Sequence, residues 1–123
     1  MSTQFEYKVC QQAEQYIKVQ PSGSAGVKEI LFMYQDACDL AESSKANKLL
    51  LDMTAIELSY PLTELLPLMK RLEDMLADFK VARICNVFEF RQDLIENISA
   101  KANLQLRNFG EEAEALTWLL EQP

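Results

Sequence analysis

Two apolar runs, KLLLDM (Lys48–Met53) and VARICNVF (Val81–Phe88), decide the fold of this chain. Each run is nearly continuous, whereas a strand with one solvated face alternates apolar and polar side chains. Continuous apolar strands are typical of the interior of a parallel sheet that is covered on both faces. We therefore predict that Leu49–Leu51 and Val81–Val87 lie side by side as central strands.

Helical patterns and a last strand surround these two runs. Strands that are joined by helices imply parallel pairing through right-handed crossovers. Leu104–Phe109 alternates apolar and polar residues, which predicts an edge strand. The last helix opens with Glu111 and Glu112, whose negative charge favours a helix N-terminus. The expected helices are Val27–Ser43, Pro61–Phe79, Arg91–Ala102 and a C-terminal helix that carries Trp118.

The N-terminal residues predict an antiparallel hairpin. Phe5–Val9 and Tyr16–Gln20 read as its two short strands. The cluster PSGSAG (Pro21–Gly26) predicts a turn before the first helix, with Ser24 as the N-cap. The expected fold is α/β, with one mixed, mostly parallel sheet in the order ββαβαβαβα. Residues 1–123 are expected to form one domain.

Two positions do not follow the helical patterns. Phe32 points to the polar side of the first helix, either as a single exposed residue or as a partner contact. The second helix has apolar positions over roughly 180°, whereas packing on one sheet needs roughly 100°. Pro67 either kinks this helix or lies in its first turn, if the helix begins near Thr63–Glu64. The preceding Thr54–Tyr60 reads as a loop or a ragged strand end.

The composition excludes several classes of function. The 123 residues are 49% hydrophobic and 25% charged, which is typical of a globular protein. A net charge of −7 argues against binding to nucleic acid or to an anionic membrane, because both require clustered Lys and Arg. The longest aliphatic run, Leu49–Leu51, is far shorter than the roughly 20 residues of a membrane span. We therefore expect no stable membrane insertion.

The chain contains no histidine and three widely spaced cysteines, Cys10, Cys38 and Cys85. The absence of histidine removes the Ser-His-Asp and Cys-His nucleophile systems and the commonest zinc ligand. We expect no enzyme activity, no metal site and no cofactor. Cys38 and Cys85 lie in apolar patterns and read as buried free thiols. Free thiols, and an N-terminus (MSTQFEYK) without the pattern of a signal peptide, indicate the cytoplasm.

The element order resembles the STAS fold of anti-sigma factor antagonists. More narrowly, it resembles the SpoIIAA-like (STAS/SEC14) family of small bacterial proteins. Three stretches carry the resemblance: LLLDMT (Leu49–Thr54), PSGSAGVKEI (Pro21–Ile30) and FGEEAEALTWLL (Phe109–Leu120).

The resemblance has two implications for function. STAS-type antagonists carry Asp-Ser-Ser-Gly just past this strand, and a partner kinase phosphorylates its serine. The corresponding residues here are Leu58–Leu62, and Ser59 stands too early for that role, so no phosphoserine switch is expected. The suggested relation of the family to lipid-binding SEC14-type domains implies a lipophilic ligand.

Three functions remain open from the sequence. A regulatory or interaction module would use Phe32 and the broad second helix for a protein partner or self-association, unless the last helix or Thr54–Tyr60 covers that face. A lipophilic ligand would instead bind beside the second helix. An enzyme would use Asp52 at the end of a buried strand, unless Asp52 only braces the following loop. The candidate ligand or partner surface comprises Phe32, Asp52, Thr54, Ser59, Tyr60, Leu68, Met69, Leu72 and Met75.

Overall fold

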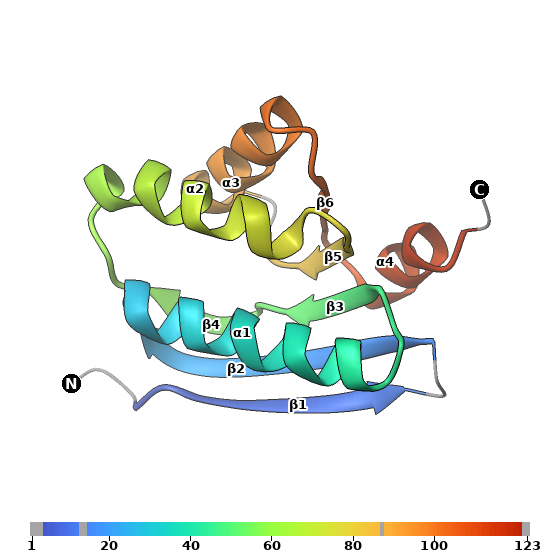
Figure 1. Cartoon of the computed structure of the whole chain (residues 1–123). Helices are drawn as coiled ribbons and strands as arrows, with labels where there is room; N and C mark the ends of the chain where they lie inside the picture. Colours follow the sequence, from blue (N-terminus) through green and yellow to red (C-terminus); the bar gives the residue numbers. More distant parts are fainter. Residues whose placement is uncertain (1–3, 13–14, 87, 122–123) are drawn as a thin grey trace.

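The computed structural model describes residues 4–12, 15–86 and 88–121 of the chain. Five of its strands follow the predicted pattern, and a sixth short strand and a 3-10 turn are additional (Figure 1). The elements are β1 (Glu6–Gln12), β2 (Tyr16–Ala25), α1 (Val27–Ser43), β3 (Lys48–Asp52), β4 (Ala55–Leu58), η1 (Leu62–Glu64), α2 (Leu65–Leu76), β5 (Lys80–Ile84), α3 (Phe90–Lys101), β6 (Gln105–Phe109) and α4 (Glu112–Leu119).

The strands form one mixed sheet with β3 and β5 at its centre. The order is β1-β2-β3-β5-β6, with β4 beside the second half of β2. Only the β1–β2 pair is antiparallel, which confirms the predicted hairpin and the mostly parallel sheet. Leu49 lies opposite Val81, so the predicted central pair is confirmed.

The predicted strand Val81–Phe88 is too long at its C-terminal end. Asp52, Ile84 and Phe109 lie in register across three neighbouring strands, and all three strands end there. A longer β5 would have no partner strand for its backbone groups, so the chain leaves the sheet. Phe88 is 94% exposed rather than buried, and Val87 lies outside the described residues.

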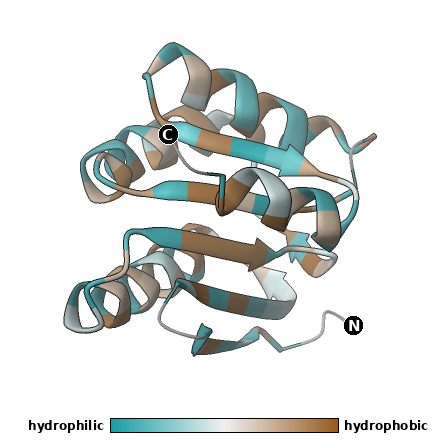
Figure 2. Ribbon diagram, turned by 90° about the vertical axis from the view of Figure 1, so that its right-hand side faces the viewer, coloured by the Kyte–Doolittle hydropathy of each residue, from teal (hydrophilic) through white to brown (hydrophobic). Residues whose placement is uncertain are grey.

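Helices cover both faces of the sheet, as continuous apolar strands require. α1, α2 and α3 pack on one face together with Leu49, Leu51 and Val81. α4 packs on the other face against Leu50 and Ala82. Figure 2 shows the resulting concentration of hydrophobic residues in the central strands. The sheet therefore carries a large core on one side and a smaller one on the other.

The broad apolar face of α2 is covered within the molecule, in part by the expected segment Thr54–Tyr60. α2 lies between α1 and α3 and contacts both (Figure 1). Its apolar side chains therefore meet two helices as well as the sheet, which accounts for a face wider than one sheet requires. The last helix was one expected cover, but α4 lies on the opposite face of the sheet.

The expected turn at PSGSAG is wrong. Pro21–Ala25 continues β2 as a strand, because β1 pairs with Pro21 and Ser22, and β4 pairs with Ser22–Ala25. Ser24 lies opposite Glu57 in this pair and does not cap a helix. Gly26 is the N-cap of α1 instead, and its backbone N–H donates to the Oε1 atom of Glu29 over 3.1 Å. Thr54–Tyr60 thus contains a strand that the sequence only suggested.

Pro67 lies in the first turn of the second helix, which was one of the two alternatives left open by the sequence. A 3-10 turn precedes α2, and Pro67 is the third residue of the helix proper. The N–H groups of a first helical turn have no partner within the helix, so a proline there removes no hydrogen bond. α2 ends at Leu76, earlier than the predicted Phe79.

Candidate functional site

The candidate residues separate into a buried site and an exposed one. The inner cavity lies between the sheet and its three covering helices, beside Arg83 of β5. The α1–α2 groove lies on the outside, beside Phe32. The inner cavity is small and has mainly apolar walls around one buried charge, whereas the α1–α2 groove is open to solvent and mixes apolar with charged side chains.

Arg83 is the chemical centre of the inner cavity. It is 1% exposed, on the strand face that points at α1, α2 and α3. Its Nη2 atom donates to the Oε1 atom of Gln92 over 2.6 Å, and Nη1 donates to the Oδ1 atom of Asn108 over 3.2 Å. Among the described residues, Nε has no hydrogen-bond partner and no carboxylate forms an ion pair with Arg83. The guanidinium thus donates to two amides and lies beside the Tyr34 hydroxyl, and within the described residues no carboxylate stands at ion-pair distance from it.

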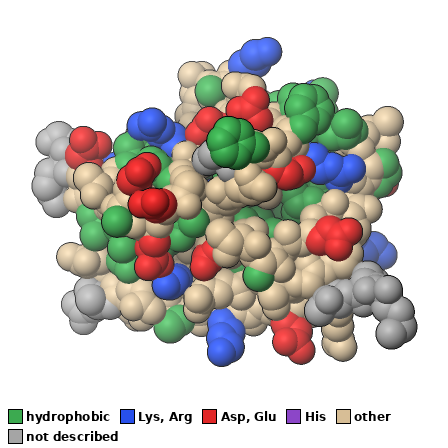
Figure 3. Space-filling view, turned by 180° about the vertical axis from the view of Figure 1, so that it is seen from behind, with side chains coloured by type: hydrophobic (Ala, Val, Ile, Leu, Met, Phe, Trp, Pro, Cys, Tyr) green, Lys and Arg blue, Asp and Glu red, His purple; other side chains and the backbone are tan. Residues whose placement is uncertain are grey.

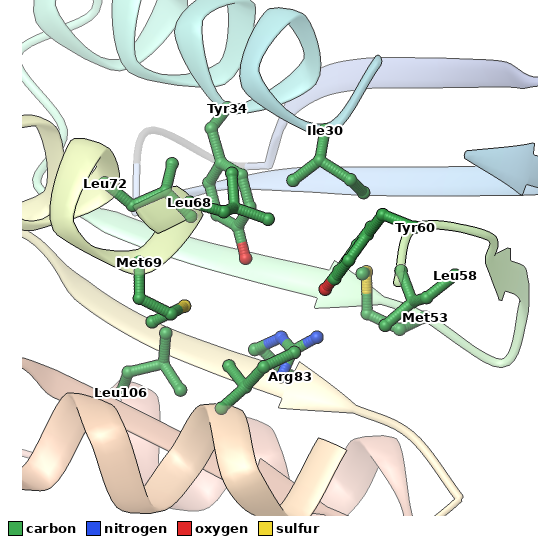
Figure 4. A pocket seen from close by; sticks show the side chains of 11 residues that line it. Ile30, Tyr34, Met53, Leu58, Tyr60, Leu68, Met69, Leu72, Arg83 and Leu106 are labelled. Atoms are coloured by element: carbon green, nitrogen blue, oxygen red, sulfur yellow. The ribbon is translucent and has the colours of Figure 1, made fainter. Parts of the chain in front are cut away.

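Two phenols face the same space as Arg83. The hydroxyls of Tyr34 and Tyr60 point toward the guanidinium from the helix side and from the end of the β4 segment (Figure 4). Burial raises the pKa of Tyr34 and the pKa of Tyr60, although the positive charge of Arg83 opposes the rise in both. Both phenols are therefore neutral at physiological pH and keep their hydroxyl hydrogens as donors.

The inner cavity itself has a volume of only about 10 Å³. This is room for about one water molecule. Its remaining walls are mainly apolar and include Ile30, Met53, Leu58, Leu68, Met69 and Leu72 (Figure 4). These side chains leave no space for an acyl chain.

Arg91 holds the segment that closes the inner cavity. Its Nη1 atom donates to the carbonyl of Leu58 over 3.1 Å and also to the carbonyl of Tyr60. Its guanidinium lies 5.4 Å from the centre of the Tyr60 ring, a distance typical of a cation–π contact. The position of Tyr60 over the cavity therefore depends on the first turn of α3.

An open cleft of about 390 Å³ lies on the outer side of this segment, near the carboxyl ends of β3 and β5. Met53 and Leu58 line both this outer cleft and the inner cavity. Gln92, which binds Arg83, also lines the outer cleft. Two apolar side chains and one amide therefore separate the two spaces.

Asp52 and Ser59 lie outside the inner cavity. The Oδ1 atom of Asp52 accepts from the backbone N–H of Thr54 over 3.2 Å and from its Oγ1 over 2.6 Å. Asp52 thus braces the loop, as the non-catalytic interpretation predicted, while Thr54 lines the outer cleft. Ser59 is exposed, and its N–H donates to the carbonyl of Ala25, which continues the β2–β4 pairing.

The other candidates divide between the two sites. Tyr60, Leu68, Met69 and Leu72 line the inner cavity. These four are buried, so they are not available to a protein partner in this structure. Phe32 and Met75, which the sequence placed in the same surface, lie in the α1–α2 groove.

The α1–α2 groove is an open hollow of about 640 Å³ that is lined by both apolar and polar side chains. Phe32 is 67% exposed there, and Leu31 and Met75 lie beside it. Lys28 and Arg71 add positive charge to a chain whose net charge is −7. On the opposite side of the molecule, acidic and basic side chains are interspersed with apolar ones (Figure 3).

A second hollow of about 580 Å³ continues the same seam between the helices. Gln35, Arg71 and Met75 line both hollows. The far hollow carries the acidic side chains of Glu42, Asp74 and Asp78. The seam therefore carries Lys28 beside apolar side chains at one end, Gln35, Arg71 and Met75 in the middle, and acidic side chains at the other end.

Sequence reasoning missed the buried polar group around Arg83. The signal was present, because Arg83 is the only charged residue in the first half of the apolar run VARICNVF. A charge within a strand that is buried on both faces must have polar partners or a ligand. The exposed apolar side chains of Leu62, Leu66 and Phe90 were also not anticipated.

Comparison with known proteins rests on structures alone. No protein-family model matches the sequence, and no curated protein matches it. An uncharacterized protein of the DUF3478 family with a SpoIIAA-like fold from Shewanella loihica superposes with a TM-score of 0.61 at 19% identity, over 97% of this chain and 98% of that one. The chain has the SpoIIAA-like fold.

An anti-sigma factor antagonist from Mycobacterium paratuberculosis has the same fold. It superposes with a TM-score of 0.65 at 13% identity, and the match covers 96% of each chain. The predicted SpoIIAA-like architecture, with its N-terminal hairpin and mostly parallel sheet, is therefore confirmed. Within the described residues, no helix combines the length and apolar character that crossing a membrane requires.

Proposed function

We propose that this SpoIIAA-like domain, residues 1–123, is a non-enzymatic regulatory module that acts by protein contact through the α1–α2 groove. The observation that carries the proposal is the exposed Phe32, beside Leu31 and Met75, in an open hollow between two helices. Exposed aromatic side chains beside other apolar groups are typical of interaction surfaces. One protein of the same fold is named an anti-sigma factor antagonist, which agrees with a regulatory role.

The charge pattern favours a second copy of this chain as the partner. Lys28, Gln35 and Glu42 are seven residues apart, so they lie on one stripe of α1. In a twofold pair with antiparallel α1 helices that cross near Gln35, Lys28 of each copy faces Glu42 of the other. The same arrangement brings the two Phe32 side chains toward the centre of the contact.

Regulation through this surface would not use a phosphoserine switch. Ser59 is the serine nearest to the expected position, and its backbone continues the β2–β4 pairing rather than opening a helix. We place the protein in the cytoplasm, because Cys38 and Cys85 are buried free thiols. The lipophilic alternative has no support from the inner cavity, whose volume is too small for an acyl chain.

Sedimentation velocity of the purified chain tests the proposal. We expect the weight-average mass to rise from monomer toward dimer as the concentration increases. Phe32→Ser should abolish this rise, whereas Phe90→Ser should not. Phe90 is a matched control, because it is a 63% exposed phenylalanine on α3, outside the groove. A wild-type protein that stays monomeric at every concentration, or equal effects of the two variants, would contradict the proposal.

A further inference from the structure

Within the described residues, Arg83 has a hydrogen-bond donor without an acceptor and a positive charge without an ion-pair partner. Two of its nitrogens donate to Gln92 and Asn108, and Nε has no partner among the described residues. The Asn108 amide is also committed on its other side, because Nδ2 donates to the Gln92 carbonyl over 2.7 Å. A buried guanidinium without a counter-charge is costly, so an uncompensated charge of this kind calls for an anion.

Three polar groups at the inner cavity can each donate a hydrogen bond, and the two hydroxyls among them can also accept one. They are the Nε–H of Arg83 and the hydroxyls of Tyr34 and Tyr60, which converge on the same space (Figure 4). A water molecule would satisfy Nε but would not offset the charge. An oxyanion accepts several hydrogen bonds at once and neutralises the guanidinium, which binds carboxylate and phosphate in a planar fork.

We propose that Arg83, Tyr34 and Tyr60 form a binding site for the oxyanion group, carboxylate or phosphate, of a small polar molecule that enters from the outer cleft. This site shares no lining residue with the α1–α2 groove, so the proposal does not depend on the proposed dimer. It assigns a ligand to a group of residues that no motif in the sequence identifies.

Entry to the site requires a movement that opens the inner cavity and also enlarges it, because its volume of about 10 Å³ holds about one water molecule. Met53 and Leu58 line both the inner cavity and the outer cleft of about 390 Å³. Methionine has three rotatable bonds and adapts to new contacts, so a rotation of Met53 joins the two spaces. The oxyanion then reaches Arg83, and the body of the ligand occupies the cleft.

The outer cleft selects a polar body rather than an acyl chain. Thr54, Asn86, Glu89 and Arg91 line it and offer donors and acceptors of both charges. It also lies at the carboxyl ends of β3 and β5, the edge at which parallel sheets commonly bind ligands. A small acid with further polar groups matches this lining, whereas a hydrocarbon tail would leave it unsatisfied.

The Nε–Hε signal of Arg83 in a ¹H–¹⁵N NMR spectrum reports directly on this site. The probes are sodium acetate, inorganic phosphate and decanoate, with sodium chloride at matched ionic strength as the reference. We expect acetate or phosphate to shift the Arg83 signal in a saturable way, and the stronger of the two identifies the oxyanion. The Nε–Hε signal of exposed Arg107 should follow ionic strength only.

Conservative variants separate a binding role from a structural one. Tyr60→Phe and Tyr34→Phe remove one donor each and keep the ring, so each should weaken binding roughly fivefold while the protein stays folded. Arg83→Lys keeps the charge but loses the fork and should abolish saturation, as read from the backbone amide of Gln92. Arg107→Lys is the matched control and should bind as the wild type does.

Three results would overturn the proposal. The first is an Arg83 signal that no oxyanion shifts beyond the chloride reference, which would mean that the cavity holds water only. The second is an equal response of Arg83 and Arg107. The third is decanoate binding much tighter than acetate, which would replace the polar ligand with a lipid. None of these results affects the sedimentation test of Phe32.

Discussion

Gln92 shows how one amide stabilises a buried charge. It is buried on the inner side of α3, and its Oε1 atom accepts a short hydrogen bond from Arg83. Gln92→Leu keeps the side-chain volume and removes the hydrogen-bond acceptor. The Nη2 atom of Arg83 is then buried without this partner. We expect a loss of about 2 kcal/mol in the free energy of unfolding, measured by urea denaturation.

A double-mutant cycle separates this effect from simple helix damage. In an Arg83→Met background no charge needs the acceptor, so Gln92→Leu should then cost well under about 1 kcal/mol. Asn97→Ala, on the exposed side of the same helix, should change stability by less than about 0.5 kcal/mol. Equal costs of Gln92→Leu in both backgrounds would show that the amide does not serve Arg83.

The buried thiols predict how stability depends on alkaline pH. Burial raises the pKa of Cys38 from 9.0 to about 12, and nearby Glu42 and Asp39 act in the same direction. The neutral thiol is thus favoured by folding. Its contribution is complete below pH 9 and is lost as the pH rises toward 12, because the unfolded chain then releases the proton more readily.

Thermal unfolding between pH 8 and pH 12 measures this effect. The midpoint should be flat at first and should fall above pH 9.0, the ordinary pKa of the Cys38 thiol, with a smaller fall in Cys38→Ala. The buried phenols of Tyr34 and Tyr60 add to the fall in both proteins, because their pKa values are also raised. An identical pH profile for the two proteins would contradict the assignment to Cys38.

The N-terminus of α1 is stabilised by a capping interaction within the helix itself. Glu29 is the third helical residue, and its carboxylate accepts from the N–H of Gly26 at the N-cap. Glu29→Ala should lower the free energy of unfolding by about 1 kcal/mol, because the N-cap donor loses its partner. Glu29→Gln retains an acceptor and should recover most of that loss. Calorimetry that finds both variants equally destabilised would argue for a charge effect at the helix terminus instead.

Elements with a strong local period were predictable. α1 begins and ends at the predicted residues, Val27 and Ser43, because its apolar positions repeat every three or four residues. The three leucines of β3 were sufficient to place it at the centre of the sheet. In both cases, the residues of one element alone were enough to predict its structure.

Elements that depend on distant partners were not predictable. Pro21–Ala25 has the composition of a turn and becomes a strand because β1 pairs with its first residues and Ala55–Leu58 pairs with Ser22–Ala25. Local propensity favours the turn, and tertiary pairing overrides it. The Arg83 site has the same origin, since Arg83, Gln92 and Asn108 come from three different elements. Tyr60, Leu68, Met69 and Leu72, which were predicted as part of a ligand or partner surface, line the inner cavity, but the charge at its centre was not foreseen.

At the scale of the whole molecule, the two faces of the sheet differ, because both candidate sites lie on the face that α1, α2 and α3 cover. The face with α4 is closed by a small core, while the face with α1, α2 and α3 carries both the α1–α2 groove and the Arg83 site. Exposed charges each contribute little, and salt screens them. The charge pattern along the seam therefore contributes to the affinity for a partner mainly at low salt, where screening is weak.

Charge reversal at the two ends of α1 tests the proposed twofold contact most directly. In sedimentation velocity at low salt, Lys28→Glu and Glu42→Lys should each shift the wild-type dimer toward monomer, because like charges then face each other across the contact. The double variant Lys28→Glu/Glu42→Lys should restore the dimer, since each reversed end again meets its opposite. A double variant that is as monomeric as the single variants, or single variants that dimerise like the wild type, would contradict the account.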